Sequence, residues 1–392
     1  MKTISSHSET ASTPSVRQHQ FDWLRVLAFL LLIPYHTGMI FVVWKFHIKN
    51  DETSHFLEFF MLLLNRWRLP LLFLVSGVGT YFALRSRSGF AFFKERFFRL
   101  FVPLVFGMFV VVPPQIYYER LQNGENIDYL TFYKTVFELV AYPAGSFSWH
   151  HLWFVAYLFI FSWLCIPLFL YFKSEKGKSI FKSLAIFLEK GKNVYWVLLP
   201  ALLLHLLLDP YFPTTHDLLH DWANFSTSLY VFLLGYFLAS QTAILEKLAR
   251  LRFLSLFIAL FFYFLFLFLR ETNLLEAFLS PKVEFAAYVV LNNGLGGFAI
   301  MAILGLAQYY LKQDHAFLRY ANAAVYPFYI LHQTLMIAIG YYVIDFQINW
   351  FLKFVIINIL TFLFSWLGYE ILKRTALTRF LFGIKRNKVV ER

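Results

Sequence analysis

The stretch FDWLRVLAFLLLIPYHTGMIF, residues 21–41, decides the fold. It is almost wholly apolar over about 20 residues, the length that an α-helix needs to cross a bilayer. Similar runs recur along the chain, so that 59% of its 392 residues are hydrophobic and only 15% are charged. Soluble domains carry about 25% charged residues. The composition therefore excludes an ordinary cytosolic enzyme, a disordered protein and a disulfide-stapled secreted domain.

The apolar runs predict one all-α, polytopic membrane bundle of about ten transmembrane helices, because a helix satisfies its own backbone hydrogen bonds in lipid. A closed barrel would show shorter, alternating segments. The first run lacks a small-residue cleavage site, so we expect it to be a retained span and not a signal peptide. The expected spans are 21–44, 57–84, 100–118, 151–172, 194–212, 224–241, 253–270, 284–310, 323–344 and 350–372.

The positive charges indicate the topology. Of the Lys and Arg residues, 25 lie in the two tails and alternate loops, and six lie in the opposite loops. Lys and Arg accumulate on the cytoplasmic side, so both termini are expected there. We divide the chain into a disordered cytoplasmic tail (1–20), a transmembrane domain (21–372) and a basic cytoplasmic tail (373–392). The oligomeric state is not readable from the sequence.

The net charge of +12 does not indicate nucleic-acid binding, because no basic patch lies on a soluble module. The single cysteine, Cys165, excludes an intramolecular disulfide and a cysteine-based metal site. His216 and His220 have metal-ligand spacing with Asp217 and Asp221, but no third motif accompanies them. We therefore predict no metal.

Ionisable residues inside the spans carry most of the functional signal, since they are costly at membrane depth. Arg25 and His36 lie about 16 Å apart on one face of a helix, and Asp22 lies one turn before Arg25. Pro34 should kink this helix and open room beside His36. The alternatives are a snorkelling anchor for Arg25 and a packing role for His36.

Arg68, in the second span, lies at about the depth of His36 if both helices are straight, so the two are expected to share a site. SWHHLWFVAYLF places His151 and Trp153 at the outer interface, where an aromatic belt is the alternative explanation. YPFYILHQTL places Tyr329 and His332 about one turn apart inside the ninth span.

Taken in order, Asp22-x-x-Arg25, His36, Arg68-x-Pro70 and Phe73-x-x-Ser76-Gly77 resemble the integral-membrane acyltransferase family three. HLWFVAYL and YANAAVYPFYILHQTL extend the resemblance over nearly the whole chain, and the glucans biosynthesis protein C branch, a group of glucan succinyltransferases, is the most similar. The family often carries a glutamate-rich stretch after the tryptophan of its fourth motif, whereas WFVAYLF contains no carboxylate.

The resemblance implies transfer of an acyl group from cytoplasmic acyl-CoA, either acetyl-CoA or succinyl-CoA, to a hydroxyl of a periplasmic or cell-surface glycan. It implies a protein of the bacterial inner membrane whose partners are the lipid bilayer, acyl-CoA and a carbohydrate acceptor.

Each candidate residue then has an expected role. Arg25, with Asp22, is placed for the CoA phosphates. His36 is the candidate general base, and Arg68 is the candidate oxyanion partner or the partner of a succinyl carboxylate. The acceptor is expected to contact Trp153, His151, Tyr329 and His332. The rival function is a transporter of an anionic or sugar substrate, although the two halves show no internal repeat.

Overall fold

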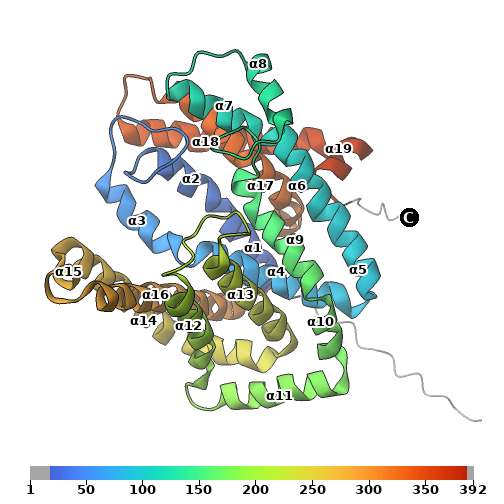
Figure 1. The fold of residues 1–392 in the computed structure, drawn as a ribbon. Helices are drawn as coiled ribbons and strands as arrows, with labels where there is room; N and C mark the ends of the chain where they lie inside the picture. The colour runs from blue at the N-terminus through green and yellow to red at the C-terminus, as the bar shows by residue number, and fades with distance from the viewer. Residues whose placement is uncertain (1–17, 386–392) are drawn as a thin grey trace, which may run out of the picture.

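The computed structural model describes residues 18–385 and confirms a polytopic helical bundle (Figure 1). Within that range there are no strands, and the one β-bridge joins Ala141 to Phe147. Eight helices are long and apolar enough to cross a membrane, and the number rises to ten if each of two bent helix pairs is one span. Residues 1–17 and 386–392, which belong to the two predicted tails, lie outside the described residues.

The first half of the chain contains the helices that hold most of the candidate residues. They are α1 (His19–Leu30), α2 (Leu32–Ile40), α3 (His55–Asn65), α4 (Arg68–Arg85), α5 (Gly89–Arg96), η1 (Phe97–Phe101), α6 (Val102–Phe106), η2 (Gly107–Val111), α7 (Pro113–Gln122), α8 (Tyr129–Lys134), η3 (Thr135–Glu138), η4 (His150–Leu152), α9 (Trp153–Leu164), α10 (Ile166–Lys173) and α11 (Glu175–Glu189).

The second half begins with a short 3₁₀ helix and continues with longer spans. Its helices are η5 (Asn193–Leu198), α12 (Leu199–Leu208), α13 (Trp222–Ser240), α14 (Thr242–Thr272), α15 (Leu274–Phe278), α16 (Pro281–Tyr310), α17 (Ala316–Val343), α18 (Trp350–Leu372) and α19 (Ala376–Leu381). Helices α14 and α16 pack side by side with α15 at the tip of the hairpin (Figure 1).

Two glycines bring α4 and α13 into backbone contact at the centre of the bundle. A Cβ atom added at Gly77 would lie 1.9 Å from the carbonyl oxygen of Phe232, and one added at Gly235 would lie 1.9 Å from that of Leu74. Small residues at such crossings let transmembrane helices approach closely. Gly77 of the second span's Ser76-Gly77 pair therefore has a packing role.

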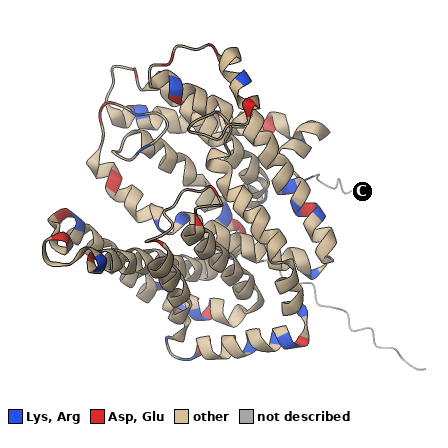
Figure 2. Ribbon diagram, in the orientation of Figure 1, with Lys and Arg blue, Asp and Glu red and all other residues tan. Residues whose placement is uncertain are grey.

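Two regions differ from the predicted pattern of continuous spans joined by loops. Residues 173–193 were expected to form a basic loop, but they contain α11, which turns by 120° into the η5–α12 segment. Gly177, Phe181 and Ala185 of α11 are buried at a spacing of four residues, whereas its lysines are exposed. Figure 2 shows these lysines as blue segments along the helix. This amphipathic pattern is typical of a helix that lies in the membrane interface. The fourth span is also bent, by 49°, between α9 and α10.

The first two spans are broken beside the candidate residues. Helix α1 ends at Leu30, four residues before Pro34, because proline cannot hydrogen-bond to that carbonyl and its ring clashes with it. The second span breaks between Asn65 and Arg68, so that Arg68 is the first residue of α4. The kink expected from Pro34 is therefore confirmed, whereas the straight second span assumed from the sequence is wrong, and each break lies within a few residues of a polar side chain.

Candidate active site

A cavity of about 1410 Å³ opens among α1, α4, α9, α17 and the C-terminal segment. Two carboxylates line it, against nine cationic side chains: Arg25, Arg87, Arg96, Arg99, Arg319, Lys373, Arg374, Arg379 and Lys385. The positive charge of Arg99, followed by burial, lowers the pKa of Lys385. The cavity is therefore built for an anionic ligand, and we call it the basic cavity.

Arg25 lies in the wall of this cavity and is held by two neighbours. Its Nη1 atom donates to Asp22 Oδ1 at 3.2 Å and to Asn322 Oδ1 at 3.0 Å. The Asn322 amide donates in turn to Asp22 Oδ1 at 3.0 Å, which closes the triangle. The predicted Asp22–Arg25 pair is confirmed, and Asn322 of α17 is a third member that the sequence did not suggest.

His36 and His332 form a buried imidazole pair between α2 and α17. His36 Nδ1 lies 3.0 Å from His332 Nε2, and His332 Nδ1 lies 2.7 Å from the carbonyl oxygen of Tyr329. A carbonyl only accepts, so the proton of neutral His332 is on Nδ1, and its Nε2 accepts from His36 Nδ1. This arrangement leaves the lone pair of His36 on Nε2, where within residues 18–385 no hydrogen bond occupies it.

Arg68 is one of the largest fully buried side chains and is only 2% exposed. Its guanidinium carbon lies 3.4 Å from the ring centroid of Tyr35, the residue before His36. In the described part of the chain, its Nε and Nη1 atoms have no hydrogen-bond partner. Two desolvated donors beside an imidazole pair form a site for developing negative charge. The depth shared by Arg68 and His36, expected from the sequence, is consistent with this contact.

His151 and Tyr329 complete the buried cluster. The His151 ring lies 5.3 Å from that of His332, and the Tyr329 hydroxyl donates to the carbonyl of His151. His151 Nε2 donates to the carbonyl of Ile330 at 3.1 Å. Three of the four residues predicted to contact the acceptor, namely His151, Tyr329 and His332, therefore lie together. Trp153 does not join them, because its ring stacks on His216 with centroids 4.0 Å apart.

An aromatic wall separates the basic cavity from the histidines. Phe29, Phe154 and Pro327 line the inner end of the cavity. The Phe29 ring lies 5.4 Å from Tyr329, and the Tyr329 ring lies 5.9 Å from His332. The basic cavity and the imidazole pair thus lie on opposite sides of a thin aromatic layer.

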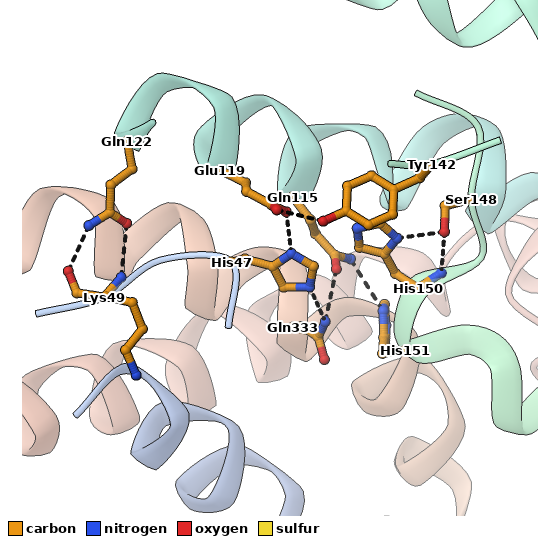
Figure 3. A network of polar contacts seen from close by, with 10 residues as sticks. All are labelled: His47, Lys49, Gln115, Glu119, Gln122, Tyr142, Ser148, His150, His151 and Gln333. Carbon is orange, nitrogen blue, oxygen red and sulfur yellow. Dashed lines mark hydrogen bonds and ion pairs between the residues drawn. The ribbon is translucent and has the colours of Figure 1, made fainter. Parts of the chain in front are cut away.

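A polar network that the sequence did not indicate lies on the other side of the histidines (Figure 3). His47 Nδ1 lies 2.5 Å from Glu119 Oε2, and Gln115 and Gln333 link this pair to His151. Both glutamines lie inside or beside apolar runs, which was the available signal. His47 and Glu119 lie at loop and helix ends, where charged residues are common.

The histidine and aspartate residues with metal-ligand spacing have internal partners. His220 Nδ1 lies 2.7 Å from Asp217 Oδ2, and Asp221 accepts hydrogen bonds from Tyr157, Thr215 and Asn224. They lie in an irregular segment before α13, where Asp221 fixes the backbone.

The comparison with protein families agrees with this geometry. A family model described as an acyltransferase domain matches residues 18–370. The chain belongs to this acyltransferase family. The match covers the imidazole pair and the part of the basic cavity before residue 370, and it confirms the resemblance drawn from the order of the motifs; Lys373, Arg374, Arg379 and Lys385 lie beyond it.

Among curated proteins, the chain is similar to the glucans biosynthesis protein C of Salmonella typhi, Salmonella typhimurium and Salmonella heidelberg. Each is 24% identical over 194 residues, which are 48% of this chain and 48% of the relative. The similarity thus spans about half the length of these relatives. No solved structure matches the chain. The chain is a multi-pass membrane acyltransferase by family, and its substrates are matters for proposal.

Proposed function

We propose that the protein transfers an acyl group, acetyl or succinyl, from cytoplasmic acyl-CoA to a hydroxyl of a periplasmic or cell-surface glycan in the bacterial inner membrane. The observation that carries the proposal is that only the aromatic layer of Phe29 and Tyr329 lies between the basic cavity and the buried His36–His332 pair. An acyltransferase that uses a phosphorylated donor needs both features. The excess of Lys and Arg at this end of the bundle supports a cytoplasmic location for the cavity.

The donor would bind with its phosphates in the basic cavity. Arg25 is oriented by Asp22 and Asn322, and guanidinium groups bind phosphate in a bidentate manner. The pantetheine arm would pass the aromatic wall of Phe29 and Phe154 and bring the thioester to His36. The other cationic side chains of the cavity add long-range attraction for the same anion.

The chemistry would use His36 as general base and Arg68 as oxyanion partner. His36 Nε2 takes the proton of the acceptor hydroxyl, and the hydroxyl oxygen attacks the thioester carbonyl carbon. The buried Nε and Nη1 donors of Arg68 stabilise the negative oxygen of the tetrahedral intermediate. The C–S bond then breaks, and the CoA sulfur takes the proton from His36. His332 holds the His36 tautomer through all these steps.

A succinyl donor would place a second demand on Arg68, whose guanidinium could instead hold the succinyl carboxylate. The acceptor would approach from the opposite face, near His151, Tyr329 and His332, with Trp153 farther out. The curated relatives are glucans biosynthesis proteins C, which supports a glucan as acceptor.

The test uses purified protein reconstituted in lipid vesicles, with acetyl-CoA or succinyl-CoA labelled in the acyl group. We expect release of CoA together with label in the glycan fraction, and loss of both with His36→Ala. Movement of an unmodified substrate across the vesicle membrane, without CoA release, would favour the transporter and overturn the proposal. An unchanged KM for acyl-CoA after Arg25→Ala would remove the phosphate contact.

A further inference from the structure

The polar network in Figure 3 joins four segments that are distant in sequence. His47 lies in the loop after α2, Glu119 lies on α7, Gln333 lies on α17, and Tyr142 and His150 lie in the segment before α9. Lys49 and Gln122 clamp the first loop to α7 through two hydrogen bonds, of 2.9 and 2.6 Å. The position of His47 is therefore fixed by the fold.

The hydrogen-bond partners assign the proton on His47. Glu119 receives the Tyr142 hydroxyl on Oε1 at 2.6 Å and faces His47 Nδ1 with Oε2 at 2.5 Å. Burial, followed by the bond to Glu119, raises the pKa of Tyr142, so the phenol remains a donor. An ionised carboxylate only accepts, so His47 carries a proton on Nδ1; its Nε2 faces the amide nitrogen of Gln333, which is a donor, and so presents a lone pair there.

The lone pair on His47 Nε2 is poorly satisfied by the protein. Its contact is the Gln333 amide, at 3.4 Å, which is long for an N–H···N hydrogen bond. The same Gln333 nitrogen also donates to Gln115 Oε1 at 3.0 Å. A ligand hydroxyl would therefore displace little when it donates to His47.

His150 offers a second polar atom at the same place. Its ring stacks on that of His47, with centroids 4.6 Å apart and planes 11° from parallel. Ser148 Oγ lies 2.6 Å from His150 Nδ1, while His150 Nε2 is buried and has no hydrogen-bond partner between residues 18 and 385. A hydroxyl can both donate and accept, so it satisfies this atom in either tautomer.

A metal ion fits this geometry less well than a hydroxyl does. Ligand atoms of His47, Glu119 and His150 all lie within 4.8 Å of one another. However, imidazole lone pairs lie in the ring plane, and two nearly parallel stacked rings direct them into separate planes. Both oxygens of Glu119 already accept hydrogen bonds.

We propose that His47 and His150 form a subsite for sugar hydroxyls of the acceptor, with Glu119 as the residue that positions His47. The subsite lies next to the reactive pair, because the Phe46 ring is 5.1 Å from that of His47 and 6.3 Å from that of His36. The negative charge of Glu119 favours a neutral hydroxyl over a carboxylate at this point. This inference rests on the proposed acyl transfer and names residues that recognise its acceptor.

The decisive variant is Glu119→Gln. Because the Tyr142 hydroxyl donates to one oxygen, the new amide keeps its oxygen there and turns its NH₂ group toward His47 Nδ1. His47 then moves its proton to Nε2 and can no longer accept from a hydroxyl. We expect KM for the acceptor to rise about tenfold, the equivalent of one hydrogen bond, with KM for acyl-CoA unchanged.

Two further substitutions separate hydrogen bonding from proton transfer. His47→Gln places an amide oxygen near the position of Nε2, so we expect it to retain most of the wild-type acceptor KM, whereas His47→Leu should lose it. Gln347→Ala, at an exposed glutamine in the α17–α18 loop, touches neither the loop clamp nor the subsite and should leave acceptor KM nearly unchanged. The assay uses reconstituted protein, labelled acyl-CoA and the periplasmic glucan fraction from a strain that lacks the protein.

The outcomes are distinguishable. If wild-type protein releases no CoA and labels no glycan, the proposed function has failed and the subsite falls with it. If wild-type protein is active but Glu119→Gln and His47→Leu leave acceptor KM unchanged, only the subsite is overturned. A loss of kcat in His47→Gln at constant KM would make His47 a base. Inactivation by a chelator that zinc reverses would assign the cluster to a metal.

Discussion

Arg68→Met is the most informative single substitution, because activity and stability should move in different directions. Arg68 is 2% exposed, and its Nε and Nη1 donors have no partner within residues 18–385. Its cation–π contact with Tyr35, at 3.4 Å, contributes on the order of 2 kcal/mol when desolvated. The desolvation penalty of a buried ion is several kcal/mol and opposes that gain.

The expected result follows from this comparison. Methionine has a similar length and no charge, so the variant should melt at the wild-type temperature or above it in detergent. Removal of an oxyanion donor costs a factor of about 10² to 10³ in kcat, so transfer should fall by that amount. The matched control is Arg66→Met, two residues away and exposed, which should change neither quantity.

The assay measures CoA release by the reconstituted variant and its melting temperature by fluorescence. Arg68→Lys retains the charge but not the planar fork, so it should recover only part of the rate. Two results would refute the reasoning. A variant that melts well below wild type would show that Arg68 stabilises the fold, and a folded variant with full activity would show that Arg68 does not touch the reacting carbonyl.

Three further predictions concern the donor side and the imidazole pair. Arg25→Ala should raise KM for acyl-CoA by at least tenfold, since hydrogen bonds to charged groups contribute about 1.5–3 kcal/mol. The control is Lys178→Ala, at an exposed lysine of α11. Equal KM values for the two variants would contradict the phosphate contact. CoA at about 100 times its Kd should stabilise the wild-type protein by about 2.7 kcal/mol in thermal unfolding, and the lack of any shift would argue against a CoA site in the basic cavity. His332→Leu should lower kcat at least tenfold, because His36 Nδ1 then loses the atom that accepts its hydrogen bond. His332→Gln retains an accepting oxygen and should keep more activity. Identical rates for the two variants would show that the His36 tautomer does not matter.

The bundle could be predicted from the sequence because every membrane span must be a long apolar run that satisfies its own backbone hydrogen bonds as a helix. Long apolar runs marked the helices, and Pro34 marked the break at Leu31. The break before Arg68 was not predicted, although Pro70 lies four residues after Arg66, in the same relation as Pro34 to Leu30. The charges of segment 173–193 predict a loop, and this prediction is wrong because its apolar residues recur at helical spacing.

The candidate residues could be predicted where an ionisable side chain lies inside an apolar run, because such side chains are rare in membrane spans. Arg25, His36, Arg68 and His332 are conspicuous inside apolar runs, and the structure places them around the basic cavity and the imidazole pair. His47 and Glu119 gave no such signal because they lie at ends and in loops. Their contact depends on how the loop after α2 lies against α7, which only tertiary structure reveals (Figure 3).

The most direct test of the central claim is mass spectrometry of periplasmic and surface glycans from cells that lack the protein. The same cells are complemented with the wild-type chain or with His36→Ala. We predict a mass increment of an acetyl or succinyl group that returns with the wild type and not with His36→Ala. Identical glycan masses in all three strains would contradict the assignment of this membrane protein as a glycan acyltransferase.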